Sequence, residues 1–132
     1  MKAIVCLKYG LPDGIRVEDI EKPFPTENQI LVKVMAASVN PIDLQIKGGF
    51  FRVFNGLLKP KDSRLGRDIA GRVESVGSRI TRFLPGDEVF GVGLGGFAEY
   101  ALTREQNLAL KPANCTFEEA ATVPVAGITA LQ

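Results

Sequence analysis

Short runs in which every second residue is apolar recur along this chain and end at clusters of glycine and proline. In residues 97–103, for example, Ala98, Tyr100 and Leu102 occupy alternate positions. A period of two is typical of a β-strand with one buried face. The strands predicted in this way span residues 2–7, 15–19, 29–39, 68–76, 88–91, 97–103 and 108–111. Seven short strands between turns indicate a mainly β domain, built as a barrel or a sandwich.

Three short helices are expected among the strands. Pro41 suits the first turn of a helix over residues 41–47, because the N–H that proline lacks would be unpaired there in any case. Thr116 is followed three residues later by Glu119, which is the pattern of a capping box at the start of a helix. A third helix begins near Pro124 in the apolar segment 123–132, which carries no C-cap signal. Its apolar face is expected to be covered by a continuation beyond Gln132 or, alternatively, to dock on its own barrel.

Residues 91–96, Gly-Val-Gly-Leu-Gly-Gly, fit the G-x-G-x-x-G pattern of dinucleotide-binding loops. That chemistry needs a helix to begin at the last glycine, so that its N-terminus faces the pyrophosphate. The residues that follow Gly96 alternate like a strand instead. We therefore interpret these glycines as a hairpin-like loop and not as a phosphate site.

Composition narrows the class of protein. The chain has 132 residues and a formal net charge of +1, which fits one domain and gives no reason to expect a nucleic-acid or membrane partner. The sequence shows neither a signal-peptide core nor an apolar run of membrane-spanning length, so a cytoplasmic location is expected. Cys6 and Cys115 are interpreted as buried or partly buried thiols and not as a disulfide framework.

The chain contains no histidine, which excludes imidazole bases, Ser-His-Asp triads and histidine metal sites within it. Residues 65–77, Leu-Gly-Arg-Asp-Ile-Ala-Gly-Arg-Val-Glu-Ser-Val-Gly, pose a separate question. They read as a strand, yet Ala70 and Gly71 are small where a packed strand prefers bulk. We expect another group to approach this backbone closely. Arg67 and Asp68 are adjacent opposite charges that can neutralise each other.

Several segments, in the same order, resemble the medium-chain dehydrogenase/reductase superfamily. They are residues 34–43 (VMAASVNPID), 66–73 (GRDIAGRV), 85–89 (PGDEV), 95–100 (GGFAEY) and 120–124 (AATVP). Within the superfamily, residues 37–43 are similar to the zinc-free NADPH:quinone oxidoreductase branch. The resemblance implies a GroES-like, partly open β-barrel with a few short helices over residues 1–132. This would be the N-terminal catalytic domain of such an enzyme, with the Rossmann cofactor domain absent from this chain.

The resemblance also implies that there is no catalytic zinc. Zinc alcohol dehydrogenases of the superfamily have a cysteine where this chain has Asn40, a histidine where it has Arg67, and another ligand near Val125. An amide, a guanidinium and an isopropyl group are no substitute for that ligand set. Ile42 stands where the zinc enzymes relay protons through a hydroxyl group, which is consistent with a loss of alcohol oxidation.

What the resemblance implies instead is hydride transfer from NADPH, with NADP as the cofactor of the full-length enzyme, to a quinone or enone acceptor. Asn40 is the expected catalytic residue, which hydrogen-bonds the acceptor carbonyl or the nicotinamide. The cofactor is expected beside Asn40, Pro41, Ile42, Asp43 and Thr129. Three alternatives stay open: Asn40 as a helix N-cap, Asp43 as a local turn or ion-pair group, and Thr129 as an ordinary helix residue.

On the substrate side, the resemblance points to Gln45, Phe50 and Arg67. It also implies that the charged pair Arg67-Asp68 lies at the rim of the cleft, as the alternative to a pair that neutralises itself. Gln45 stands where this branch often has a tyrosine, whose phenol is the usual candidate for a proton donor in the cleft. Without that phenol no side chain can be named as the proton donor, and solvent serves equally well. Phe50 belongs to an aromatic segment at residues 48–58, which implies an apolar acceptor or, alternatively, a part of the core.

Three functional hypotheses follow. The leading one is the catalytic domain of a reductase, inactive as this chain alone, whose full-length form is expected to be a homodimer acting on a small molecule. A free-standing barrel that serves as a binding or scaffold module is the alternative from a different class. A fragment of a zinc alcohol dehydrogenase is the third, opposed by the residues at the metal positions.

Overall fold

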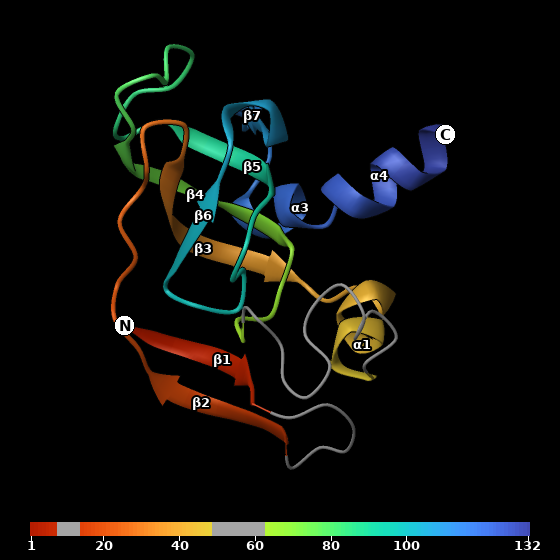
Figure 1. The fold of residues 1–132 in the computed structure, drawn as a ribbon. Coiled ribbons are helices and arrows are strands. Elements are labelled where there is room, and N and C mark those ends of the chain that lie inside the picture. The colour runs from red at the N-terminus through yellow and green to blue at the C-terminus, as the bar shows by residue number, and fades with distance from the viewer. Residues whose placement is uncertain (8–13, 49–62) are drawn as a thin grey trace.

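The computed structural model describes residues 1–7, 14–48 and 63–132 (Figure 1). The strands are β1 (Lys2–Cys6), β2 (Ile15–Asp19), β3 (Ile30–Ser38), β4 (Asp68–Val76), β5 (Glu88–Val92), β6 (Tyr100–Thr103) and β7 (Leu108–Leu110). The helices are α1 (Pro41–Gly48), α3 (Phe117–Ala121) and α4 (Pro124–Leu131), with a 3₁₀ turn η2 at Glu105–Asn107. Every strand and helix expected from the sequence is present, with ends shifted by at most a few residues.

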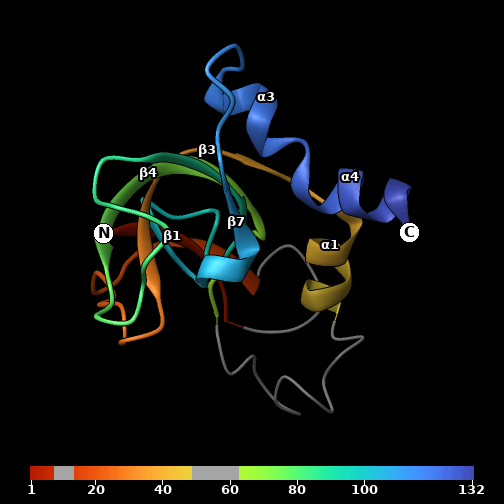
Figure 2. The ribbon, with the colours of Figure 1, turned by 90° about the horizontal axis from the view of Figure 1, so that it is seen from above.

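The strands form two antiparallel sheets. β1 pairs with β2, and the other five strands form a sheet in the order β6-β3-β4-β5-β7. Seen from above, the larger sheet curves around its inner face (Figure 2). Its edge strands β6 and β7 are not paired with each other, so the barrel stays partly open. The mainly β, partly open architecture expected from the sequence is therefore confirmed.

The stretch before β6 joins the two sheets, which explains why this strand begins later than expected. Ile4 N donates to Phe97 O at 2.8 Å, and Glu99 N donates to Lys2 O at 3.1 Å. Residues 97–99 therefore pair with β1, whereas the ladder with β3 begins at Tyr100, next to a bond from Val34 N to Glu99 O at 3.0 Å. One continuous segment serves both sheets and is interrupted where it crosses between them.

The glycine-rich loop before this strand is not a phosphate loop. Leu94 forms an isolated antiparallel bridge with Leu102, so residues 91–96 fold back against the strand that follows. A strand, and not a helix, comes next in the chain. The hairpin-like interpretation is confirmed, since the loop is followed by a strand paired back on it and not by a helix.

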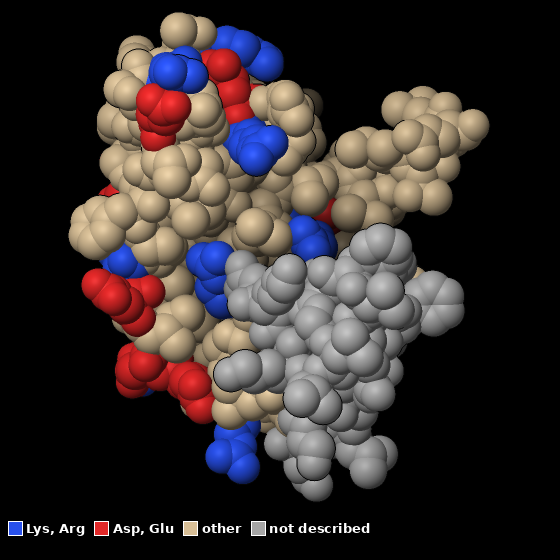
Figure 3. All heavy atoms as spheres, viewed as in Figure 1, with Lys and Arg blue, Asp and Glu red and all other residues tan. Residues whose placement is uncertain are grey.

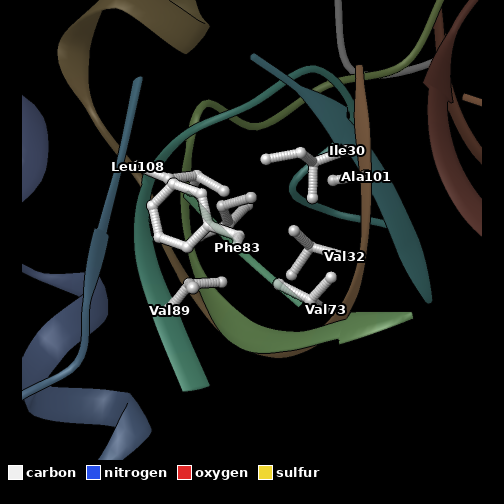
Figure 4. Close-up of a cluster of buried hydrophobic side chains, with 8 residues drawn as sticks. Ile30, Val32, Val73, Phe83, Val89, Ala101 and Leu108 are labelled. Atoms are coloured by element: carbon white, nitrogen blue, oxygen red, sulfur yellow. The ribbon is translucent and has the colours of Figure 1, made fainter. Parts of the chain in front are cut away.

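Eight buried apolar side chains form the main core inside the curved sheet (Figure 4). They are Ile30, Val32, Ile69, Val73, Phe83, Val89, Ala101 and Leu108. Phe83 comes from the connection between β4 and β5 and places its ring among the strand residues. Cys6 is also buried and Cys115 is partly buried, as expected. The core occupies one face of the sheet, and helix α3 packs on the other.

Helix α3 covers the outer face of β4 and its neighbours. Ala120 and Ala121 pack against Ala70 in a second buried cluster. Three alanines in contact let the helix lie close to the strand, because none of them projects a long side chain. This contact is one reason why residue 70 is small.

The capping box that starts α3 is present as predicted. Thr116 Oγ1 accepts from Glu119 N at 3.1 Å, and Glu119 Oε2 accepts from Thr116 N at 2.9 Å. We expect Thr116→Ala to lower the free energy of unfolding by about 1 kcal/mol, because one amide at the helix start loses its acceptor. Urea unfolding of both proteins checks this value. Thr116→Ser keeps the hydroxyl group and is expected to retain most of the stability.

Gly71 is small because the backbone of β3 lies over it. A Cβ atom at this position would lie 2.1 Å from the carbonyl oxygen of Lys33. The register of β3 against β4 shifts at the same place: Val34 lies opposite Gly71, and Ala36 lies opposite Ala70. Met35 is the additional residue of a β-bulge. The close approach expected from the sequence is thus made by a neighbouring strand.

Helix α4 carries no charged residue and shows an uncharged surface in Figure 3. Pro124 is buried, whereas Ile128 is 52% exposed and Leu131 is 90% exposed. A cavity of about 350 Å³ lies between α4 and the residues of β5 and β7. Only the beginning of α4 therefore docks on the barrel. None of the helices described is long and apolar enough to span a bilayer.

Candidate active site

The bulge at Met35 decides which side chains of β3 meet those of β4. Before the bulge, Val34 packs against the main core, whereas after it Ala36 packs against the cluster under α3. The extra residue therefore reverses the faces of the strand. As a result Ser38 lies opposite Asp68 on the outer face. A site is thus built where β3 ends and β4 begins.

Asp68 is the centre of this site and has no exposed surface (0%). Its Oδ2 accepts from Ser38 Oγ at 3.1 Å and from Asn40 Nδ2 at 3.0 Å. Val125 N, in the first turn of α4, donates to Oδ1 at 3.3 Å and to Oδ2 at 3.2 Å. One buried carboxylate therefore holds together the end of β3, the residue before α1 and the start of α4.

This arrangement corrects both interpretations of Asp68. It does not lie at the rim of a cleft, because it is fully buried. It does not pair with Arg67 either, since its hydrogen bonds go to Ser38, Asn40 and Val125. The physical reason is strand geometry: neighbouring residues point to opposite faces, so Asp68 shares its face with Ala70 and not with Arg67.

Asn40 directs its amide nitrogen inward. Besides its bond to Asp68, Nδ2 lies 3.4 Å from Ser38 Oγ, and the residue is 8% exposed. The amide oxygen accepts no hydrogen bond from the described part of the chain. An acceptor atom is therefore left for a bound molecule. The N-cap alternative requires that oxygen to serve the first turn of α1, and no such bond is present among the described residues.

Asp43 closes the first turn of α1 on Asn40, as the local-turn alternative expects. Its Oδ2 accepts from Asn40 N at 2.9 Å, and Asp43 N donates to Asn40 O at 3.0 Å. Its Oδ1 is buried and has no hydrogen-bond partner among the described residues. Burial raises the pKa of Asp43 above its usual 3.8, and the nearby charge of Asp68 adds to this. The amide of Asn40 and the charge of Arg67 oppose the shift.

The raised pKa of Asp43 has a defined effect on stability. The folded state binds the proton more tightly than the unfolded state, so Asp43 favours folding below pH 3.8, and this contribution is lost as the pH rises through the folded pKa. We therefore expect Asp43→Asn, which is neutral throughout, to gain stability relative to the native protein between pH 4 and pH 7. Urea unfolding of both proteins across that range measures the change.

Asp19 provides the matched control for this experiment. It is exposed, and the hydrogen bond and charge of Lys2 lower its pKa. Asp19→Asn is therefore expected to lose stability relative to the native protein as the pH rises, which is the opposite sign. A difference between Asp43→Asn and the native protein that did not change with pH would contradict the assignment.

The other expected site residues lie around this centre. Pro41, Ile42 and Gln45 are exposed on α1. Thr129 lies on α4, where its hydroxyl group donates to Val125 O at 2.7 Å. That bond is the behaviour of an ordinary helix residue, although the oxygen can still accept. Phe50 and the aromatic residues after it lie outside the described residues.

Arg67 is partly exposed and lines a cavity of about 310 Å³. The same cavity is also lined by Arg104, Gln106 and Asn107. A guanidinium, a second cation and two amides can hold a polar or anionic group there. The substrate-side role expected for Arg67 stays a prediction.

The three positions that hold zinc in the resembling enzymes do not form a metal site here. Asn40 has its nitrogen bonded to Asp68, Arg67 is a cation, and Val125 contributes only a backbone N–H. Within the described residues, no group of three or more His, Cys, Asp or Glu side chains could hold a metal ion. These donors do not fit a tetrahedral Zn²⁺ ion.

Sequence reasoning missed Ser38 and the role of Asp68. The available signal was strand parity: an Asp two residues before an alanine in a largely apolar strand shares the buried face of that alanine. A charge buried there requires donors, and Ser38 and Asn40 supply them. The backbone N–H of Val125 has no signature in the sequence, because every residue except proline can donate from that position.

Comparisons with known proteins show the family to which this chain belongs. Residues 26–113 match the family described as the alcohol dehydrogenase GroES-like domain. The chain is 37% identical to the quinone oxidoreductase of Sus scrofa, over 98% of its own length and 39% of that protein's length. It is 38% identical to the NADPH-dependent alkenal/one oxidoreductase, chloroplastic, of Arabidopsis thaliana, over 98% of the chain and 36% of the relative.

Solved structures of quinone oxidoreductases are also similar to this chain. The structure of the quinone oxidoreductase from Coxiella burnetii is 34% identical, with a TM-score of 0.88 over 100% of this chain and 43% of that one. The Escherichia coli quinone oxidoreductase complexed with NADPH is 28% identical, with a TM-score of 0.85 over 98% of this chain and 39% of that one. The chain thus spans about two fifths of the length of the curated relatives it matches.

Proposed function

Because this chain belongs to the alcohol dehydrogenase GroES-like domain family, we propose that it is the catalytic part of a zinc-independent, NADPH-dependent reductase acting on a quinone or an enone. The observation that carries the proposal is the Asn40–Asp68 pair at the place where a zinc ligand would stand. Relatives named quinone oxidoreductase and alkenal/one oxidoreductase support the acceptor class. The structure complexed with NADPH supports the cofactor.

The residues of the site fit the nicotinamide end of such a cofactor. The free amide oxygen of Asn40 is an acceptor for a hydrogen-bond donor of the cofactor, and the exposed Pro41 and Ile42 offer an apolar flank. Thr129 provides a further hydroxyl oxygen on α4. Bound nicotinamide supplies the hydride. The chain itself supplies position and electrostatics at the reacting centre.

No side chain on the described part of α1 offers a hydroxyl or phenol as a proton donor. Gln45 is exposed and is an amide, which does not release a proton at neutral pH. Arg67 remains charged and stabilises negative charge without giving up its proton. We therefore assign the proton that completes reduction to solvent.

The test is an assay of the complete gene product for NADPH oxidation with a panel of quinones and enones. We expect activity that persists after dialysis against a zinc chelator, with less than one zinc per chain by metal analysis. Asn40→Ala is expected to reduce kcat/KM for NADPH oxidation by at least about tenfold, because one oriented hydrogen bond is lost. Arg16→Ala, at an exposed position of β2, serves as the matched control. One bound zinc per chain, or full activity in Asn40→Ala, would refute the proposal.

A further inference from the structure

Asp68 determines which end of the Asn40 amide is available to a ligand. Val125 N donates to both carboxylate oxygens, and Ser38 Oγ lies 3.1 Å from Oδ2. Asp68 is therefore surrounded by donors, and toward Asn40 it acts as the acceptor. Only the NH₂ end of an amide can face such a group. The 3.0 Å contact from Asn40 Nδ2 to Asp68 Oδ2 has that polarity.

The rest of the fold prevents Asp68 from moving to suit a ligand. It has no exposed surface, and its partners are anchored in β3 and in the first turn of α4. The bulge at Met35 sets Ser38 on the same face, so this orientation is built into the pairing of β3 with β4. An amide held by a fixed, buried carboxylate is pre-organised before any ligand binds.

We propose that Asp68 is a positioning residue that fixes Asn40 with its amide oxygen toward the cofactor. The site then recognises a hydrogen-bond donor on the nicotinamide half, either the carboxamide NH₂ or a ribose hydroxyl. This inference rests on the proposed function. It also replaces the expectation that Asn40 contacts the acceptor carbonyl, because two oxygens with no hydrogen between them repel each other.

The first test is Asp68→Leu in the complete gene product. Leucine has a similar shape but offers no acceptor to the NH₂ of Asn40, so the amide is no longer held with its oxygen toward the cofactor. We expect the dissociation constant for NADPH, measured by calorimetry, to rise about tenfold. Ser38→Ala removes one partner of Asp68 without changing the amide polarity and is expected to shift it less than threefold.

The second test exchanges the two side chains. Asn40→Asp alone places two carboxylates side by side and is expected to weaken NADPH binding at least tenfold. Combined with Asp68→Asn, the pair regains its hydrogen bond with the direction reversed, and an acceptor oxygen again remains at position 40. The double variant is expected to bind NADPH within about threefold of the native enzyme. A residue with a purely structural role would not produce this rescue.

An analogue of NADPH in which an acetyl group replaces the carboxamide identifies the donor. If the native enzyme prefers NADPH about tenfold and Asp68→Leu abolishes the preference, the carboxamide NH₂ is recognised. If both cofactors bind equally and Asp68→Leu weakens both, the donor is a ribose hydroxyl. Either result supports the inference.

Three results would overturn it. NADPH affinity that is unchanged in Asp68→Leu removes the positioning role, as does a double variant that binds no better than Asn40→Asp. A native enzyme without measurable NADPH affinity refutes the proposed function itself. It also refutes the recognition of a hydrogen-bond donor on the nicotinamide half, because that inference rests on the proposed function. Because the native enzyme is measured first, the two kinds of failure are distinguishable. Circular dichroism and thermal melting of each variant show whether it is folded.

Discussion

Gly71→Ala is expected to lower the free energy of unfolding by about 3–5 kcal/mol, a loss that is exceptional for adding one methyl group. The methyl carbon would lie 2.1 Å from Lys33 O, which belongs to the backbone of the neighbouring strand. A backbone carbonyl in the middle of a sheet cannot rotate away as a side chain can. Relief therefore requires β3 and β4 to separate at the bulge.

The same separation would disturb the site. The bulge places Ser38 and Asn40 beside Asp68, so a variant that folds is also expected to lose NADPH affinity. Chemical unfolding measures the first effect and calorimetry the second. Gly127→Ala in α4 is the matched control, because its methyl group would meet only Val123 Cγ1 at 3.2 Å. It is expected to be neutral or slightly stabilising through helix propensity. Equal effects of the two substitutions would contradict the steric argument.

Phe83→Ala is expected to lower the free energy of unfolding by about 3–5 kcal/mol. Phe83 is 2% exposed and lies inside the curve of the sheet with Val73, Val89 and Leu108 (Figure 4). Its ring comes from a connection, yet it fills the centre of the main core. The cluster that contains Phe83 is built from residues of all five strands of the larger sheet. These strands cannot all move inward to fill the cavity that alanine would leave.

The neighbouring residue supplies the control for this prediction. Leu84 is 68% exposed, and Leu84→Ala is expected to change the free energy of unfolding by less than about 0.5 kcal/mol. Urea unfolding of both variants, with the slopes compared, separates loss of packing from a change in the unfolded state. A loss below about 1 kcal/mol for Phe83→Ala would show that this ring is not part of the core.

The sequence was sufficient to predict the elements, because local patterns determine them. The alternation of apolar residues predicted the strands, and the spacing of Thr116 and Glu119 predicted the start of α3. The later start of β6 was not predictable, since it depends on which sheet residues 97–99 pair with. That choice is made by β1, almost a hundred residues earlier in the chain.

The site was predicted only in part, and for a similar reason. Asn40 and Asp43 belong to one short segment at the start of α1, and the structure places both of them in the candidate active site. Asp68 was interpreted either as a charge at the rim of a cleft or as one half of a pair with its neighbour Arg67, because adjacent charges in a sequence invite those interpretations. The bulge at Met35, which has no signature in the sequence, decides that Ser38 faces Asp68 instead.

The three partners of Asp68 lie 30, 28 and 57 residues away along the chain. Contacts between such distant segments close large loops, and the entropy of closure is lost before the contacts can compensate for it. The site should therefore mature after the hairpins and the helix start, as one of the last events of folding. Substitutions of Asp68 would then accelerate unfolding while leaving the refolding rate nearly unchanged.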